Sequence, residues 1–177
     1  MTNHSYFNLD GDPSKSNSDY LLTIDADAYT PVDSTFMTTD EIVSVEGTDM
    51  DFRTPTAVGA RIDNDFEQLK NGKGYDHNWV LNTKGDVTRP CATLESPSTG
   101  IVLDVYTNEP GIQIYAGNFL DGTLTGKKGI VYGHRASVCL ETQKYPDTPN
   151  KPEWPSALLK PGEKYDSHCI YRFSVKK

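Results

Sequence analysis

The chain has 177 residues, of which 36% are hydrophobic and 24% are charged, as is typical of one folded domain with a sizeable core. Its formal net charge of −8 argues against a nucleic-acid surface, because such a surface needs basic patches to neutralise phosphates. No apolar run approaches the ~20 residues of a membrane span, and no basic and apolar leader follows Met1, so we expect neither a membrane segment nor a secretory signal.

The predicted elements are mostly short strands separated by turns. In chain order we expect strands at 20–24, 41–45, from 80–81 onward, 91–95, 101–107, 111–116, 138–142 and 168–175. Residues 64–71 form the one predicted helix, while 25–35 and 74–79 are expected to be irregular. About eight short strands with almost no helix predict an all-β fold, an antiparallel β-sandwich in one domain.

Alternation assigns side chains of two of these strands to opposite faces. Ile112 and Ile114 lie on one face of their strand, and Gln113 lies on the other. In the same way, Val138 and Leu140 oppose Cys139 and Glu141. Glu141 is the last charged group before a run of four prolines at three-residue spacing, which predicts an ordered, extended loop. A carboxylate beside a stiff loop bearing Tyr145 and Trp154 suggests a sugar site, and the alternative is an edge-strand glutamate in water.

The three cysteines, Cys91, Cys139 and Cys169, are far apart and odd in number. This pattern favours reduced thiols in or beside the core of a cytoplasmic protein, and it disfavours a disulfide framework or a zinc site.

Polar and aromatic residues cluster around His4, at 3–9, and around Asp76 and His77, at 74–79. With Gln113 and Glu141 these are the candidates for chemistry. Each has a simpler alternative: a disordered terminal residue for His4, a turn pair for Asp76 and His77, and a solvent-facing residue for Gln113.

Several common catalytic motifs are missing. The sequence has no HExxH or close histidine spacing, so no metal site is expected. It also has no GxSxG, P-loop or GxGxxG, which disfavours a serine hydrolase and a nucleotide cofactor. We expect no cofactor.

Taken together, seven blocks resemble the aldose 1-epimerases, also called galactose mutarotases. They span essentially the whole chain in the family's order, and the combination is highly specific. The blocks are NHSYFNLDG (3–11), DADAYTPVD (25–33), DFRTP (51–55), GYDHNWVL (74–81), EPGIQIYAGNFL (109–120), LETQKYPDTPN (140–150) and PGEKY (161–165).

The resemblance implies a galactose mutarotase-like supersandwich that interconverts the α and β anomers of hexoses such as glucose and galactose. The family's general base lands on Glu141 and its general acid on His4. Its sugar-binding aspartate and glutamine land on Asp76 and Gln113. These roles suit ring opening, which needs a base on the C1 hydroxyl and an acid on the ring oxygen. An aromatic platform for the sugar is expected from Trp79, Tyr115, Phe119 or Trp154.

The sequence departs from the family in length, since the family's chains are roughly twice as long. Their first half, with an Asn-Arg pair and a second active-site histidine, has no counterpart here, and His77, His134 and His168 do not occupy that histidine's place. We therefore expect a domain that lacks the family's N-terminal half, and that self-associates or needs that half. The alternatives to an epimerase are a non-catalytic sugar-binding β-sandwich and an inactive fragment. A phosphosugar enzyme is disfavoured because no Arg/Lys cluster marks a phosphate site.

Overall fold

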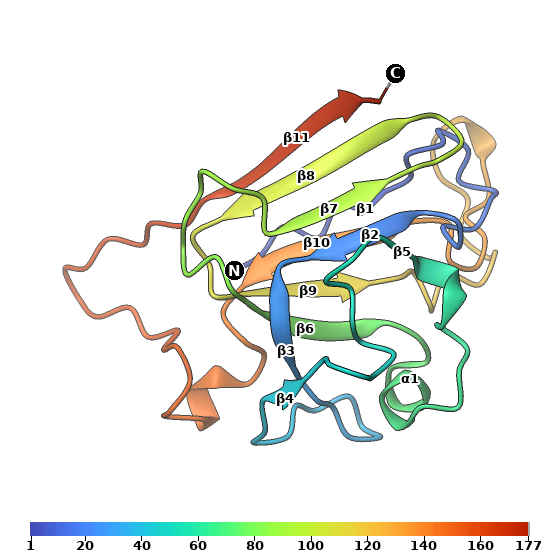
Figure 1. Ribbon diagram of the computed structural model, residues 1–177. Coiled ribbons are helices and arrows are strands. Elements are labelled where there is room, and N and C mark those ends of the chain that lie inside the picture. The colour runs from blue at the N-terminus through green and yellow to red at the C-terminus, as the bar shows by residue number, and fades with distance from the viewer. Residues whose placement is uncertain (177) are drawn as a thin grey trace.

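Two antiparallel sheets pack face to face in the computed structural model, which describes residues 1–176 (Figure 1). The larger sheet has the strand order β1-β10-β9-β6-β3-β4. Its strands are β1 (Tyr6–Phe7), β3 (Ala26–Thr30), β4 (Val43–Ser44), β6 (Asp76–Leu81), β9 (Gly111–Tyr115) and β10 (Val138–Gln143).

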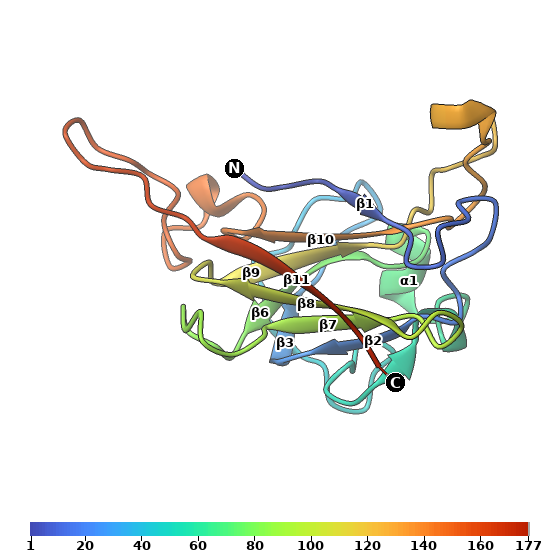
Figure 2. The ribbon, with the colours of Figure 1, turned by 90° about the horizontal axis from the view of Figure 1, so that it is seen from above.

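The second sheet has the order β11-β8-β7-β2-β5. Its strands are β2 (Leu21–Ile24), β5 (Thr56–Ala57), β7 (Ala92–Glu95), β8 (Ile101–Thr107) and β11 (Cys169–Val175). The two layers are seen from above in Figure 2. The predicted all-β antiparallel sandwich is confirmed, and β7 and β8 pair as an antiparallel hairpin.

The core lies between the two layers and follows from the alternation in the sequence. Ile112 and Ile114 of β9 and Leu140 of β10 are fully buried, and they meet Leu103 and Val105 of β8 from the other sheet. Since neighbouring side chains in a strand point to opposite faces, the polar residues between them face outward from the six-stranded sheet.

One α-helix, α1 (Glu67–Gly72), occurs among the described residues, slightly later than the predicted 64–71. It ends at Lys73, whose left-handed backbone (φ 56°) lets its N–H reach the carbonyls of Leu69 and Lys70. Short 3₁₀ turns are η1 (Val58–Ala60), η2 (Lys127–Gly129) and η3 (Thr148–Asn150). Within residues 1–176 no helix has both the length and the apolar character needed to cross a bilayer.

Two regions expected to be irregular contain strands. β6 begins at Asp76, inside the predicted loop 74–79, and β3 lies inside the predicted irregular region 25–35. Both segments are rich in Asp or Asn, which are depleted in strands, but each strand is paired within the larger sheet. Pairing and burial of one face therefore override local propensity at these positions.

The cysteines are as expected. Cys91 and Cys139 are buried, Cys169 is half-buried, and all three are free thiols.

The sandwich is open along the edge formed by β1 and β11. Phe173 pairs with the core residue Leu103, so its side chain faces inward, toward the other sheet. Opposite it, β1 is only two residues long, and Phe7 of β1 contacts Tyr171 and Phe173 with ring centroids 4.9 and 6.0 Å apart. Phe173 stays 55% exposed and Val175 65% exposed. The segment between η3 and β11 projects away from both sheets (Figure 2).

Candidate active site

Three of the four predicted site residues lie on the outer face of neighbouring strands in the larger sheet. Glu141 on β10 pairs directly with Gln113 on β9. Asp76 on β6 pairs with Tyr115, two residues further along β9. Cross-strand partners share a face, so the sheet brings Glu141, Gln113 and Asp76 together on the side opposite the core.

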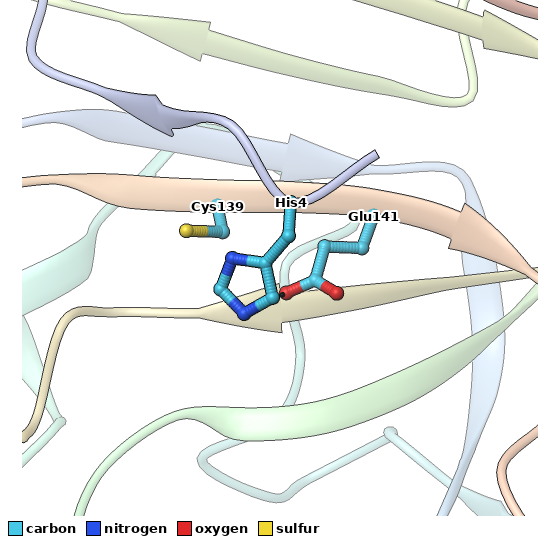
Figure 3. A group of neighbouring side chains, drawn as sticks. All are labelled: His4, Cys139 and Glu141. Carbon is cyan, nitrogen blue, oxygen red and sulfur yellow. Dashed lines mark ion pairs between the residues drawn. The ribbon is translucent and has the colours of Figure 1, made fainter. Parts of the chain in front are cut away.

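His4 reaches this face from the segment just before β1. Its Nε2 lies 3.3 Å from Oε1 of Glu141, as drawn in Figure 3. The imidazole stacks on Tyr6 at a centroid distance of 5.0 Å and meets the edge of Tyr115 at 6.0 Å. His4 is thus held between two aromatic rings, in contact with the carboxylate.

Glu141 is only 6% exposed, and β10 lies between β1 and β9. The alternative of a solvated edge-strand glutamate is therefore wrong. Burial raises the pKa of Glu141 from 4.5 to about 7; the positive charge available on His4 opposes this rise, and the negative charge of Asp76 adds to it. A carboxyl group with such a pKa is poised to take or release a proton near neutral pH.

Asp76 is fixed by a hydrogen bond of 2.8 Å from the side-chain amide of Gln113 to Oδ1. Gln143 donates a longer bond, 3.4 Å, to Oε1 of Gln113. Burial raises the pKa of Asp76, and the bond from Gln113 and the charge of His4 oppose this. The arrangement presents fixed acceptors and donors beside the Glu141 carboxylate.

A small cavity of about 80 Å³ lies between the side of the sheet that bears Asp76 and Gln113 and the loops above it. It is lined by Asp76, Asn78 and Gln113 from the sheet, and by Val32, Phe36, Thr38 and Pro146 from the loops. The loops are tied together, since the Thr38 hydroxyl donates a hydrogen bond of 3.0 Å to the carbonyl of Pro146. Because pockets for whole ligands usually exceed ~300 Å³, this cavity suits a few hydroxyl groups, and the rest of a ligand must lie across the open face.

The structure reduces the candidates for an aromatic platform. Trp79 is fully buried in the core, where its indole N–H donates to the carbonyl of Met50 at 3.0 Å, so it is excluded. Trp154 packs against Tyr145 at a centroid distance of 5.6 Å and is only 5% exposed, so little of its ring is open to a ligand. Tyr115 and Phe119 remain, and their rings stack at 6.2 Å beside the site.

His77 is not part of this face. It pairs with the core residue Ile114 and is fully buried. Burial lowers the pKa of His77 to about 4, so it is neutral near pH 7. It is a structural residue of the core rather than one half of a turn pair.

Cys139 was not among the residues predicted for the site. Its neighbour two positions on is Glu141, so both share the outer face of β10. One ligand atom each of His4, Cys139 and Glu141 lies within 4.8 Å of the others (Figure 3). The alternation in 138–141 already placed Cys139 beside Glu141, but its proximity to His4 depends on how the first residues cross the sheet.

Comparisons with known proteins agree with this architecture. A family model described as aldose 1-epimerase matches residues 1–172. A galactose mutarotase from Homo sapiens is 47% identical over 176 residues, which are 99% of this chain and 49% of that protein. An aldose 1-epimerase from Escherichia coli K12 is 42% identical, over 98% of this chain and 50% of that protein.

Solved structures show the same likeness. An aldose epimerase homologue from C. elegans superposes with a TM-score of 0.81 at 30% identity, over 99% of this chain and 51% of that one. A galactose 1-epimerase from Lactobacillus acidophilus superposes with a TM-score of 0.79 at 31% identity, over 99% of this chain and 48% of that one. The chain thus spans about half the length of the relatives it matches.

The fold is that of the galactose mutarotase-like β-sandwiches. Within that class, the chain belongs to the aldose 1-epimerase family.

Proposed function

We propose that this chain contributes the acid/base pair of an aldose 1-epimerase, which interconverts the α and β anomers of hexoses such as glucose and galactose. The observation that supports this most strongly is the contact of 3.3 Å between Nε2 of His4 and Oε1 of Glu141 on a polar sheet face. Ring opening removes a proton from the C1 hydroxyl and adds one to the ring oxygen. Both oxygens are bonded to the same carbon, so an acid and a base that act on them must lie close together.

In this mechanism Glu141, as a carboxylate, takes the proton of the C1 hydroxyl while protonated His4 gives one to the ring oxygen. The C1–O5 bond breaks and the open aldehyde forms. Rotation about C1–C2 presents the other face of the carbonyl, and the same two groups run the steps in reverse. The sugar is neither oxidised nor reduced, and the two side chains suffice for the proton transfers.

Asp76 and Gln113 are proposed to bind sugar hydroxyls. Their mutual hydrogen bond of 2.8 Å fixes the orientation of both groups, so their free lone pairs and N–H point in set directions. A sugar that lacks a matching hydroxyl leaves one of these half-buried groups unpaired, which lowers its affinity.

A second candidate function is a fragment that completes the fold of another chain and has no turnover of its own. The open edge favours it, because Phe173 and Val175 face inward yet are 55% and 65% exposed. We propose that this edge is covered either by a second copy of the chain or by an N-terminal half like that of the family's longer members. The three separate free thiols favour a reducing compartment, and we propose the cytoplasm.

The test is polarimetry of α-glucose and α-galactose anomerisation with the purified chain, alone and with the complementary half. Glu141→Gln keeps the side chain's shape but removes its basicity, and we expect turnover to fall at least ~100-fold. His4→Asn is expected to slow the same chemical step. Glu153→Gln, at an exposed position in the segment between η3 and β11, is the matched control and leaves turnover unchanged. Turnover by Glu141→Gln close to that of the unmodified chain would exclude Glu141 as the base.

A further inference from the structure

We propose that His4, Cys139 and Glu141 form a binding site for Zn²⁺, and that zinc bound there blocks the acid/base pair. The three residues offer an imidazole nitrogen, a sulfur and a carboxylate oxygen within 4.8 Å of one another (Figure 3). This is the donor set that Zn²⁺ takes in proteins, and the thiolate disfavours Mg²⁺ and Ca²⁺, which prefer oxygen ligands.

The distances suit a tetrahedral ion after a small movement. Bonds of roughly 2.0–2.3 Å from zinc to nitrogen, oxygen and sulfur place tetrahedral ligand atoms about 3.3–3.8 Å apart. His4 Nε2 and Glu141 Oε1 already stand 3.3 Å apart. The widest separation in the group is at most 4.8 Å, so it must close by up to about 1 Å.

The side chain of His4 can move more freely than those of Cys139 and Glu141, and this freedom permits the closure. Cys139 and Glu141 are buried and two residues apart on one face of a paired strand, so they form a fixed edge of the site. His4 lies outside β1, and its side chain is 49% exposed. The imidazole can therefore adjust toward an ion held by the other two groups, and zinc can enter from the exposed side, where solvent supplies the fourth ligand.

The proton balance is simple. Cys139 loses its thiol proton to solvent as the Zn–S bond forms, while neutral His4 and ionised Glu141 each give a lone pair. No group is oxidised or reduced. Once bound, the Glu141 carboxylate donates electron density to the cation and becomes a much weaker base toward the C1 proton, and the His4 nitrogen that ligates zinc cannot carry the proton that the ring oxygen needs. The blocking effect rests on the proposed function, but metal binding does not.

The test is a titration of the full chain, free of any metal-binding tag, with Co²⁺ as a spectroscopic substitute for zinc. We expect one equivalent to bind with a near-ultraviolet thiolate-to-cobalt charge-transfer band, and Zn²⁺ to displace it. Cys139→Ser should abolish the band and weaken Zn²⁺ binding at least ~10-fold, since even second-shell changes cost that much. Cys169→Ser, which changes a half-buried thiol on β11, is the matched control and should keep both the charge-transfer band and the affinity for Zn²⁺.

His4→Ala provides a variant that does not touch the core, because His4 is half exposed; it should also weaken Zn²⁺ binding at least ~10-fold. The site is refuted if no charge-transfer band forms in the unmodified chain. It is equally refuted if the band survives Cys139→Ser in a folded chain, or disappears with Cys169→Ser. In an active preparation, Zn²⁺ should inhibit anomerisation and Cys139→Ser should relieve the inhibition; occupied zinc with unchanged turnover would overturn the blocking effect alone.

Discussion

Gln113 and Asp76 are joined diagonally across two strands, not directly opposite each other. Asp76 stands opposite Tyr115 and Gln113 stands opposite Asn78, yet the Gln113 amide donates to Asp76 Oδ1 at 2.8 Å. The diagonal bond spans the outer face between β6 and β9 and brings Asp76 toward Glu141. One bond therefore fixes a hydroxyl-binding pair and keeps a second negative charge close to the Glu141 carboxyl.

Asp76→Asn is expected to weaken hexose binding by about 10–100-fold, because it removes the charged acceptor and lets Gln113 turn. Isothermal titration with galactose and glucose measures this directly, with the complementary half present if the chain alone does not bind. Asp121→Asn, an equivalent change in an exposed loop, should leave the affinity unchanged. An unaltered sugar affinity in the Asp76 variant contradicts its proposed role.

The pKa of Glu141 is expected to respond to its two charged neighbours in opposite directions. It is raised to about 7, mainly by burial, while the charge of His4 opposes this rise and the charge of Asp76 adds to it. Asp76→Asn should therefore lower the pKa of Glu141, and His4→Asn should raise it. Carbon-13 NMR of the side-chain carboxyl, followed from pH 4 to 9 in the three proteins, measures these changes without any need for activity. Shifts of the same sign in both variants would refute this electrostatic arrangement.

The same shift predicts how stability depends on pH. Between about pH 4.5 and pH 7 the folded chain keeps a proton on Glu141 that the unfolded chain has lost. The contribution of Glu141 to the free energy of unfolding therefore falls as pH rises through that window. At about 1.4 kcal/mol for each pKa unit, the loss is on the order of 3 kcal/mol.

Urea unfolding of the unmodified chain and of Glu141→Gln, at several pH values, isolates this effect. The comparison with Glu141→Gln is necessary because His77 also makes stability depend on pH. The pKa of His77 is lowered to about 4, so its contribution to the free energy of unfolding falls as pH decreases below 6.5. This is the opposite direction to that of Glu141. We expect Glu141→Gln to gain stability relative to the unmodified chain as pH rises from 5 to 7. A constant difference across this range is the contradicting result.

The sequence predicted those parts of the fold that alternation controls. Residues 111–115 and 138–143 alternate between apolar and polar side chains, and the structure places their apolar members in the core and Gln113 and Glu141 on the site face. The start of β6 was missed because Asp76 and Asn78 have low strand propensity, and only their pairing with β9 makes them strand residues. Trp79 was considered as an aromatic platform because of its residue type, but its position in the register of β6 turns its side chain into the core.

Local sequence patterns could not predict that His4 and Cys139 lie close together. This proximity joins residues far apart in the chain and depends on Tyr6 pairing with Cys139, which sets where the chain before β1 crosses the sheet. Residue types identified His4 and Glu141 as candidates, while their distance of 3.3 Å required the tertiary structure.

The open edge formed by β1 and β11 predicts self-association of the chain. Phe173 and Val175 lie on the face of β11 that packs inward, but β1 is too short to cover them. An uncovered apolar edge strand favours pairing with another chain. We expect the isolated chain to elute from size-exclusion chromatography as a species larger than a monomer, or to unfold readily, and to show weak or no epimerase turnover.

Phe173→Lys places a charge on the inward face of this edge and should reduce self-association, because strand edges with inward-pointing charges resist pairing. Leu158→Lys is the matched control: Leu158 is 73% exposed but lies on the projecting segment before β11, so self-association should persist. Supplying the expected N-terminal half, in cis or as a separate chain, should cover the same edge. It should also steady His4, whose segment borders β1, and so raise turnover. A stable monomer of the unmodified chain with turnover that the added half does not increase would show that the exposed edge has no partner.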